Sequence, residues 1–365
     1  MEERLIHWKK LLEFATKAMM FAGASAEDAE MVADNLVQSN LRGIDSHGVS
    51  RLKRYMDGIK SGYMIADAKP KIVKESSVLA NVDGGNGLGQ VAGTFGMKLA
   101  IKKAQKEGIG LVTVFNSNHY GFAGYYPLMA LEHNFMGISM TNSAPLAVPT
   151  FGKNAIIGTN PIAVTAPTKK NKPWVMDFAT TVAPRGKLEV YNRLGKELPE
   201  GWATDENGHV TRDAARVLNN LGKLLGGGIL PLGGAGELYG GHKGYGLIVM
   251  VDVFCAILSG SNHGPHVVSK KDGKVNFPRV GHMFMVIDPE YFVGLDTFRT
   301  NMDQYIDELK NSEKAKGEPR IYVHGEKEFE EHDKREKNGC PLDAKTAEGL
   351  MNISQESGVP IEFMN

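Results

Sequence analysis

A segment near the start of the chain, Leu41–Tyr55, carries three side chains that together suit a small carboxylate. If a helix begins near His47, then His47, Arg51 and Tyr55 recur every four residues and share one face. Arginine can bind a carboxylate through two parallel hydrogen bonds, histidine can carry a proton, and tyrosine adds a hydroxyl. The alternative is an amphipathic helix whose polar face is only solvated.

A second histidine, His119, lies in the polar, glycine-rich segment Phe115–Tyr126 (FNSNHYGFAGYY). It follows a predicted strand, and Gly121 and Gly124 allow the backbone to approach a neighbour closely. A histidine at a strand end in such a turn is well placed for general acid/base chemistry. A structural or solvent-facing histidine is the alternative.

Three later segments contain groups that suit a charged ligand. The segments 157–167 and 176–187 bring small hydroxyl side chains around one carboxylate, Asp177. Lys243 lies among glycines in GGHKGYG, just before a predicted helix, where a lysine and a helix N-terminus can contact a phosphate. A Schiff base at Lys243 is the rival chemistry, although nothing in the neighbouring sequence would desolvate the amine.

Two other motifs are weaker. The sequence Asp83–Gly89 (DGGNGLG) resembles a dinucleotide-binding loop, but Gln90 replaces the third glycine of GxGxxG, so we favour a strand-to-helix turn. His263 and His266 have metal-ligand spacing but no nearby carboxylate or cysteine, and we predict no metal site there.

Composition excludes several classes of protein. The 365 residues include 42 Lys and Arg against 42 Asp and Glu, so the balance of charge indicates no nucleic-acid or membrane-surface partner. Two cysteines, Cys255 and Cys340, exclude a disulfide framework and indicate a reducing compartment. The first residues lack a signal peptide's apolar block, and Leu247–Leu258 is too short to span a bilayer. We therefore expect a cytoplasmic protein.

Both ends of the chain are predicted to be helical, and together they form one domain, residues 1–75 with 289–365. Gly23 ends the first helix, and Ser25–Asp28 resembles a capping box that opens a helix running to about Leu41. A third helix continues from the Leu41–Tyr55 segment to Gly62. Near the C-terminus we expect helices at about 289–312, 326–338 and 346–357.

Residues 76–288 are predicted to form a β-rich domain. Short apolar runs with turn signals follow one another, and only about 92–107 and 125–132 have helical spacing between them. The fold class is therefore mixed α/β, with a largely antiparallel sheet that is not a Rossmann fold. A loop-rich insertion with one short helix is expected at about 192–240, then a fully buried helix at 244–260 and a strand at 282–287.

Five sequence blocks, taken in order, resemble the type 2 malate/L-lactate dehydrogenase family: RGIDSHGVSRL, NSNHYGFAGYY, GTNPIAVTAP, MDFATT and GGHKGYGL. The resemblance covers essentially the whole chain. It implies an oxidoreductase that uses NAD or NADP to act on a small 2-hydroxy or 2-oxo acid. It also implies a homodimer with a non-Rossmann cofactor fold, in agreement with the strand pattern.

The resemblance also implies roles for individual residues. His119 matches the family's proton acceptor or donor, and His47 matches a second histidine that competes for this role. Ser46, Arg51 and Tyr55 match substrate-side positions. The matched cofactor-side positions are Ser143, Asp177, Phe178, Ala179, Thr180, His242, Lys243, Gly325 and Glu326. Two features depart from the family pattern: His324 stands where members often have proline, and residues 192–225 look longer than in shorter members.

The mechanism that we predict is hydride transfer between C2 of the acid and C4 of the nicotinamide. His119 would exchange the hydroxyl proton and Arg51 would hold the carboxylate. We expect the pocket between the helical and sheet domains and the pyrophosphate near Asp177–Thr181 and Lys243. The resemblance further implies that the partner subunit completes the pocket. The rivals are a non-catalytic carboxylate-binding protein and a lyase with a Schiff base at Lys243. The sequence alone does not specify the acid, or NAD against NADP.

Overall fold

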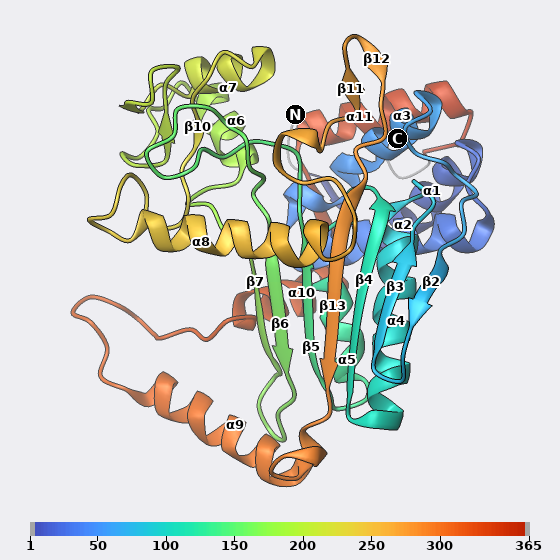
Figure 1. Ribbon diagram of the computed structural model, residues 1–365, viewed down its shortest axis with the longest axis vertical. Helices are drawn as coiled ribbons and strands as arrows, with labels where there is room; N and C mark the ends of the chain where they lie inside the picture. The colour runs from blue at the N-terminus through green and yellow to red at the C-terminus, as the bar shows by residue number, and fades with distance from the viewer. Residues whose placement is uncertain (1–3, 362–365) are drawn as a thin grey trace.

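The computed structural model describes residues 4–361. The ends of the predicted helical domain, residues 1–3 and 362–365, lie outside the described residues. A long central sheet forms the body (Figure 1), helices from both ends of the chain gather beside one end of it, and a smaller lobe with α6 and α7 stands across from them. No helix in the described part of the chain has the length and apolar character needed to cross a membrane.

The central sheet has seven strands and is mixed but largely antiparallel, as predicted. The order across the sheet is β2 (Lys71–Glu75), β3 (Leu79–Asp83), β4 (Ile109–Ser117), β13 (Val280–Ile287), β5 (Met136–Thr141), β6 (Ile162–Ala166) and β7 (Trp174–Phe178). The β3–β4 pair is parallel, and the other neighbours in the sheet are antiparallel. Edge strand β2 is exposed along its length and carries Lys71 and Lys74, charges that discourage edge-to-edge pairing.

The two faces of the sheet are covered by different helices. Side chains alternate along β13, so that Phe284 packs with α4 (Gly89–Glu107) and α5 (Tyr125–Leu131). On the other face, Met283 packs with α8 (Gly241–Asp252) and the π-helical turn η3 (Val253–Ile257) that continues it. Strand β3, helix α4 and strand β4 form a single β-α-β unit, which the strand spacing did not predict.

The expected full burial of the helix at 244–260 is wrong. Ile248, Val251 and Cys255 are buried against the sheet, but Val249 and Val253 on the other side of the same helix are exposed. The sequence is apolar all round, which is typical of a buried helix or of one that meets another surface. In this chain only one side of the helix is covered.

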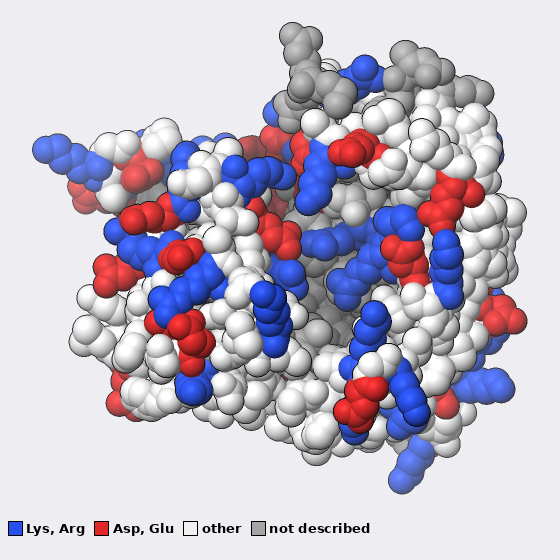
Figure 2. All heavy atoms as spheres, turned by 90° about the horizontal axis from the view of Figure 1, so that it is seen from above, with Lys and Arg blue, Asp and Glu red and all other residues white. Residues whose placement is uncertain are grey.

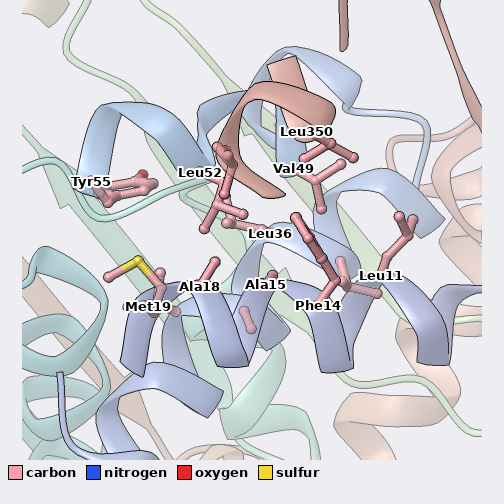
Figure 3. Close-up of a cluster of buried hydrophobic side chains, with 14 of the residues drawn as sticks. Leu11, Phe14, Ala15, Ala18, Met19, Leu36, Val49, Leu52, Tyr55 and Leu350 are labelled. Carbon is pink, nitrogen blue, oxygen red and sulfur yellow. The ribbon is translucent and has the colours of Figure 1, made fainter. Parts of the chain in front are cut away.

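The helices from the two chain ends share one core. α1 (Trp8–Phe21), α2 (Ala26–Leu41) and α3 (Leu52–Lys60) pack with α11 (Ala344–Ser357), where Phe14, Leu36, Leu52 and Leu350 meet (Figure 3). β1 (Arg4–Ile6) pairs antiparallel with β14 (Cys340–Leu342), and α10 (Glu326–Asn338) lies on α2. The predicted cap of α2 is confirmed, because the Ser25 side chain accepts a hydrogen bond from the Asp28 backbone N–H.

Helix α9 (Leu295–Asn311) does not join that core. A short 3₁₀ turn, η5 (Pro289–Tyr291), precedes it, so the helix begins later than predicted. The nearly buried Asp303 carboxylate accepts hydrogen bonds from the backbone N–H groups of Lys169, Lys170 and Asn171 in the β6–β7 turn. α9 therefore lies at the far end of the sheet from the other terminal helices (Figure 1).

The segment predicted as a loop-rich insertion forms a compact lobe. It contains α6 (Arg185–Arg193), α7 (Ala214–Lys223) and a small antiparallel sheet of β10 (Gly228–Ile229), β8 (Ala203–Thr204) and β9 (Val210–Thr211). Leu188, Leu198 and Val217 are fully buried in a core of its own. Farther on, a 3₁₀ turn η4 (Gly264–His266) and a hairpin of β11 (Lys270–Lys271) and β12 (Lys274–Val275) lead to β13.

Candidate active site

The helix predicted to begin near His47 begins later, so the predicted shared helical face is wrong. Two 3₁₀ turns, η1 (Asp45–His47) and η2 (Val49–Arg51), come first, and α3 starts at Leu52. Gly48 is extended between these turns, and glycine fits there because a Cβ would lie 2.3 Å from the Asn40 side chain. Asn40 holds this turn by accepting the Val49 N–H at 2.8 Å and donating to Asp45 at 2.6 Å.

Tertiary structure nevertheless brings the predicted catalytic residues together. The rings of His47 and His119 stack with centroids 5.6 Å apart and planes 15° apart. The Tyr55 hydroxyl lies 2.7 Å from Nδ1 of His119. The Ser46 hydroxyl lies 3.0 Å from Nδ1 of His47, and Nε of Arg51 donates to the Ser46 carbonyl at 2.6 Å. The five residues therefore form one cluster between the α3 region and the end of β4.

The loop that carries His119 is fixed from two sides. On one side, the Asn118 side chain of this loop donates to the Asn86 and Gly87 carbonyls at 3.0 and 2.8 Å. On the other side, the Asp177 carboxylate accepts the Gly124 N–H at 2.7 Å. Burial raises the pKa of Asp177 to about 6. His119 therefore sits in a preorganised turn, which is what precise proton transfer requires.

The same contacts account for the glycine-rich sequence before α4. A Cβ at Gly87 would lie 2.9 Å from the Ala68 side chain, and one at Gly89 would lie 2.4 Å from the His119 carbonyl oxygen. Other segments of the same polypeptide therefore fill the space around the Gly84–Gly89 loop. These glycines permit close backbone packing, in agreement with the predicted strand-to-helix turn.

The cluster is electrostatically unusual. Burial lowers the pKa of His119 well below 6.5, and the positive charge of Arg54 lowers it further. Burial, with Arg51 and Arg54, also lowers the pKa of His47 to about 4. Both histidines are therefore neutral at pH 7. Figure 2 shows a hollow in the upper face of the molecule into which several Lys and Arg side chains project. The positive charges of Arg51 and Arg54 beside the two histidines favour an anionic ligand.

Sequence reasoning missed two residues of this cluster. Arg54 lies three residues after Arg51, a spacing that could have placed both guanidinium groups on the same side. Arg54 is exposed and makes no hydrogen bond or ion pair with any residue in 4–361. Gln90, next to the glycine-rich loop, is completely buried, and neither of its amide atoms has a hydrogen-bond partner among the described residues. No local sequence signal distinguishes Gln90.

The predicted cofactor-side residues fall into a hydroxyl cluster, a lysine region and a segment beside β7. Ser143 Oγ accepts the Thr159 N–H at 3.0 Å, and the fully buried Thr180 hydroxyl donates to the Thr159 and Asn160 carbonyls. The hydrogen of the Thr180 hydroxyl is therefore already used in bonds within the protein. Asp177 and Phe178 end strand β7, and Ala179 leads from it to Thr180.

The lysine region adjoins the hydroxyl cluster through backbone contacts. The Leu232 N–H donates to the Thr180 carbonyl at 3.1 Å, and Leu232 also lines a hollow of about 490 Å³ beside Lys243 at the N-terminus of α8. His242 and Lys243 are exposed, and the Lys243 ammonium has no hydrogen-bond or ion-pair partner in the described part of the chain. The glycines at 233, 240 and 244 line this hollow too.

Gly325 and Glu326 lie beside β7, where Val175 donates to the His324 carbonyl at 3.2 Å. A Cβ at Gly325 would lie 2.9 Å from the Val175 side chain, which explains glycine at this contact. The Glu326 carboxylate pairs with Lys310 and Arg320 and accepts the Val323 N–H. It is therefore held in place by its own neighbours.

Comparisons with known proteins agree on one family. A sequence model of the family described as Malate/L-lactate dehydrogenase matches residues 6–351. Malate dehydrogenase from Pyrococcus abyssi is 50% identical over 350 residues, which cover 96% of this chain and 94% of the relative. L-sulfolactate dehydrogenase from Methanocaldococcus jannaschii is 39% identical, with 93% of each chain covered. The crystal structure of malate dehydrogenase from Entamoeba histolytica superposes with a TM-score of 0.93 at 38% identity, covering 98% of this chain and 99% of that one.

Proposed function

The chain belongs to the malate/L-lactate dehydrogenase family and is a 2-hydroxyacid dehydrogenase, and on this premise we propose that His119 and Arg51 carry its reaction. The enzyme interconverts a small 2-hydroxy acid and its 2-oxo acid with a nicotinamide cofactor. The observation that carries the proposal is the contact of 2.7 Å between Tyr55 and His119 beside His47 and the arginines. One group to move a proton and one to hold a carboxylate are what this chemistry needs from the protein.

In oxidation, His119 accepts the hydroxyl proton of the acid, and in reduction it returns that proton to the oxo group. Because the pKa of His119 is lowered, mainly by burial, the neutral acceptor form dominates at pH 7. An ordinary histidine has a pKa of 6.5, and the pKa of His119 lies well below it. Oxidation should therefore lose rate only at pH values well below 6.5. Reduction needs the protonated form, and its rate should rise as the pH falls.

Arg51 binds the carboxylate next to the reacting carbon, since a guanidinium matches a carboxylate with two hydrogen bonds. Arg54 supplies a second positive charge near His119, stronger in its effect on that ring than Arg51. A second charge favours an acid with a second anionic group, as in the malate and sulfolactate of the relatives' names. We therefore propose that dianionic acids are better substrates than lactate.

The residues around Lys243 fit the phosphates of a nicotinamide dinucleotide. An exposed, unpaired lysine stands in the first turn of α8 beside a glycine-lined hollow, and helix N-termini favour phosphate. When bound, the nicotinamide ring accepts or supplies the hydride. Lys243 and the turn at Asp177–Thr181 would hold the pyrophosphate. Contacts of Ser143 and of the segment at 325–326 with the cofactor, which the matched family positions imply, belong to this proposal as well.

We also propose that the enzyme is a homodimer. The exposed apolar side of α8 and η3, with Val249, Val253 and Ile257, is a surface that a partner subunit would cover. Sedimentation or light scattering at micromolar concentration tests this part, and a strictly monomeric enzyme with full activity would contradict it.

The function is tested with a panel of 2-oxo acids, each with NADH and with NADPH, read at the nicotinamide absorbance. Turnover of oxaloacetate or another dianionic oxo acid, faster than of pyruvate, is expected. Nicotinamide binding without turnover of any acid would favour a non-catalytic binding protein instead. Covalent trapping of substrate on Lys243 by borohydride would favour the lyase, although the exposure of Lys243 argues against the desolvated amine that a Schiff base prefers.

A further inference from the structure

Arg335, in the last turn of α10, joins this helix to residues 43–48, which we call the substrate turn. Its Nη1 donates to the Asp45 carboxylate at 2.8 Å and to the Asn40 carbonyl at 2.7 Å. Its Nε donates to the Glu331 carboxylate, one turn earlier on the helix, at 2.9 Å. Only 12% of the Arg335 side chain is exposed, so these charge-assisted bonds are largely shielded from water.

The substrate turn is confined between α2 and α10. The Asp45 carboxylate also accepts from the Asn40 amide at 2.6 Å, and the Asn40 side-chain oxygen accepts the Val49 N–H at 2.8 Å. Gly43 has a φ of +76°, a conformation that favours glycine, and a Cβ there would lie 3.5 Å from the Glu331 side chain. Arg335 therefore completes a set of contacts that holds the turn from two helices.

The position of the substrate turn affects the position of the Arg51 guanidinium. The Ser46 carbonyl accepts a hydrogen bond from Nε of Arg51 at 2.6 Å. Within the described residues neither terminal nitrogen of Arg51 is hydrogen-bonded, so both are left for a carboxylate. A shift of the turn would therefore move the two groups that face the acid, Ser46 and Arg51.

The loop that carries His119 has supports of its own. The Asn118 side chain donates to the Asn86 carbonyl at 3.0 Å, and the Asp177 carboxylate accepts the Gly124 N–H at 2.7 Å. Neither of these bonds involves the substrate turn. A change in the turn should therefore weaken binding of the acid more than it impairs proton transfer.

Helix α10 is fixed at both ends. At its start, the Glu326 carboxylate pairs with Arg320 at 3.2 Å and accepts the Val323 N–H at 3.1 Å. At its end, the Gly339 N–H donates to the Arg335 carbonyl at 2.8 Å, and β14, which follows, pairs with β1. The Arg335 guanidinium therefore extends from a well-held backbone.

We propose that Arg335 is a positioning residue for binding of the acid. It holds Asp45 and Asn40 and thereby fixes the substrate turn. The Ser46 carbonyl of that turn then orients the Arg51 guanidinium towards the carboxylate. The inference rests on the proposed function, in which Arg51 binds the acid. The alternative is an ion pair that only stabilises the fold.

The test replaces Arg335 with glutamine, which removes the charge and the planar fork. We expect KM for the preferred 2-oxo acid to rise about tenfold or more, the effect of losing a hydrogen bond between charged groups. The turnover number should fall by a smaller factor, and nicotinamide affinity and the pH dependence should stay unchanged. A folded Arg335→Gln enzyme with an unaltered KM would overturn the proposal.

Arg335→Lys keeps the charge, but an ammonium cannot reproduce the planar fork that bonds three acceptors. We expect a KM between those of wild type and Arg335→Gln. This partial rescue is not expected if position 335 only stabilises the fold. If Arg335→Gln does not fold, Arg335→Lys provides the same comparison, and a wild-type KM in that variant would then overturn the proposal.

Lys334→Gln is the matched control, because it removes the same charge from the neighbouring position. The Lys334 side chain is 65% exposed and pairs with Glu331 at 3.1 Å, and within residues 4–361 it makes no bond to the substrate turn. Its KM should stay within about twofold of wild type, as expected for an exposed ion pair. Equal rises of KM in the two variants would assign the effect to overall charge and overturn the proposal.

Amide hydrogen exchange tests the contact without substrate or turnover. The His47 N–H donates to the Ile44 carbonyl at 2.9 Å, and the Gly48 N–H donates to the Asp45 carbonyl at 3.2 Å. In Arg335→Gln these amides should exchange about tenfold faster, while amides of β4 keep their wild-type rates. Unchanged exchange in the turn, or faster exchange throughout the chain with an unaltered KM, would overturn the proposal.

A double variant tests whether Arg335 acts through Asp45. Combining Arg335→Gln with Asp45→Asn should raise KM by less than the product of the two single effects, and a full product would overturn the proposal. Failure of the proposed function is distinguishable from failure of this inference. The first would leave KM unaltered in Arg51→Lys as well, whereas the second would leave it unaltered in Arg335→Gln alone.

Discussion

A methyl group added at Gly89 should damage catalysis without touching any catalytic side chain. Gly89 opens α4 directly beneath the loop that carries His119. In Gly89→Ala, the new Cβ would lie 2.3 Å from the Asn118 carbonyl oxygen and 2.4 Å from that of His119. Ordinary contact begins at 3.4 Å, so one backbone must move by about 1 Å. Both obstructing atoms are backbone, and no side-chain rotation can relieve the overlap.

The expected loss follows from that displacement. A shift of about 1 Å in a catalytic group can lower the rate about a hundredfold, because the reacting atoms leave their near-attack geometry. Overpacking costs about 1–3 kcal/mol of folding free energy, which a domain of ordinary stability can tolerate. We therefore expect a folded enzyme with kcat reduced about a hundredfold and with nearly unchanged cofactor affinity.

The assay compares kcat, Tm and nicotinamide fluorescence for Gly89→Ala and for Gly349→Ala. A Cβ at Gly349, in α11, would meet nothing within 4 Å, so that variant should keep full activity and gain about 0.5–1 kcal/mol from helix propensity. A Gly89→Ala enzyme that is folded and turns over within about threefold of wild type would show that the placement of His119 does not limit the reaction.

Three further substitutions address the ligand side. Arg51→Lys keeps the charge but loses the planar fork, so KM for the acid should rise and turnover should fall, whereas an unaltered KM would remove Arg51 from the site. Arg54→Gln removes the charge that, after burial, most lowers the pKa of His119, so the acid limb of oxidation should move to higher pH. Lys53→Gln, whose ammonium pairs with nearby carboxylates, is its control, and equal shifts in both variants would refute a specific effect. Lys243→Ala should weaken cofactor binding about tenfold or more, as measured by fluorescence, and unchanged binding would place the phosphates elsewhere.

Local pattern was sufficient where an element's identity depends on its own residues. The Ser25 cap places the start of α2, and closely spaced apolar runs without helices between them predict an antiparallel sheet. The bounds of α10, Glu326–Asn338, agree with the prediction because glycines, Gly325 and Gly339, flank the helix at both ends. The choice of His119 as a candidate rested on its strand-end position, and the loop geometry agrees with that reasoning.

Local pattern failed where distant contacts decide the structure. Asn40 holds the turn around Gly48 and α3 begins only at Leu52, so His47 and Tyr55 meet at His119 through tertiary packing and not through a shared helical face. The exposure of one side of α8 could not be predicted, because its sequence is apolar on all sides.

The most direct test of the proposed reaction compares His119→Ala with His47→Ala in reduction of the preferred 2-oxo acid. We expect His119→Ala to lower kcat by about two to four orders of magnitude, the usual contribution of general acid/base catalysis, with nicotinamide binding intact. His47→Ala should lose less, since His47 only stacks on the acting ring. If His119→Ala turns over nearly as fast as wild type while His47→Ala is inactive, the two histidines have the opposite roles and the proposed mechanism is wrong.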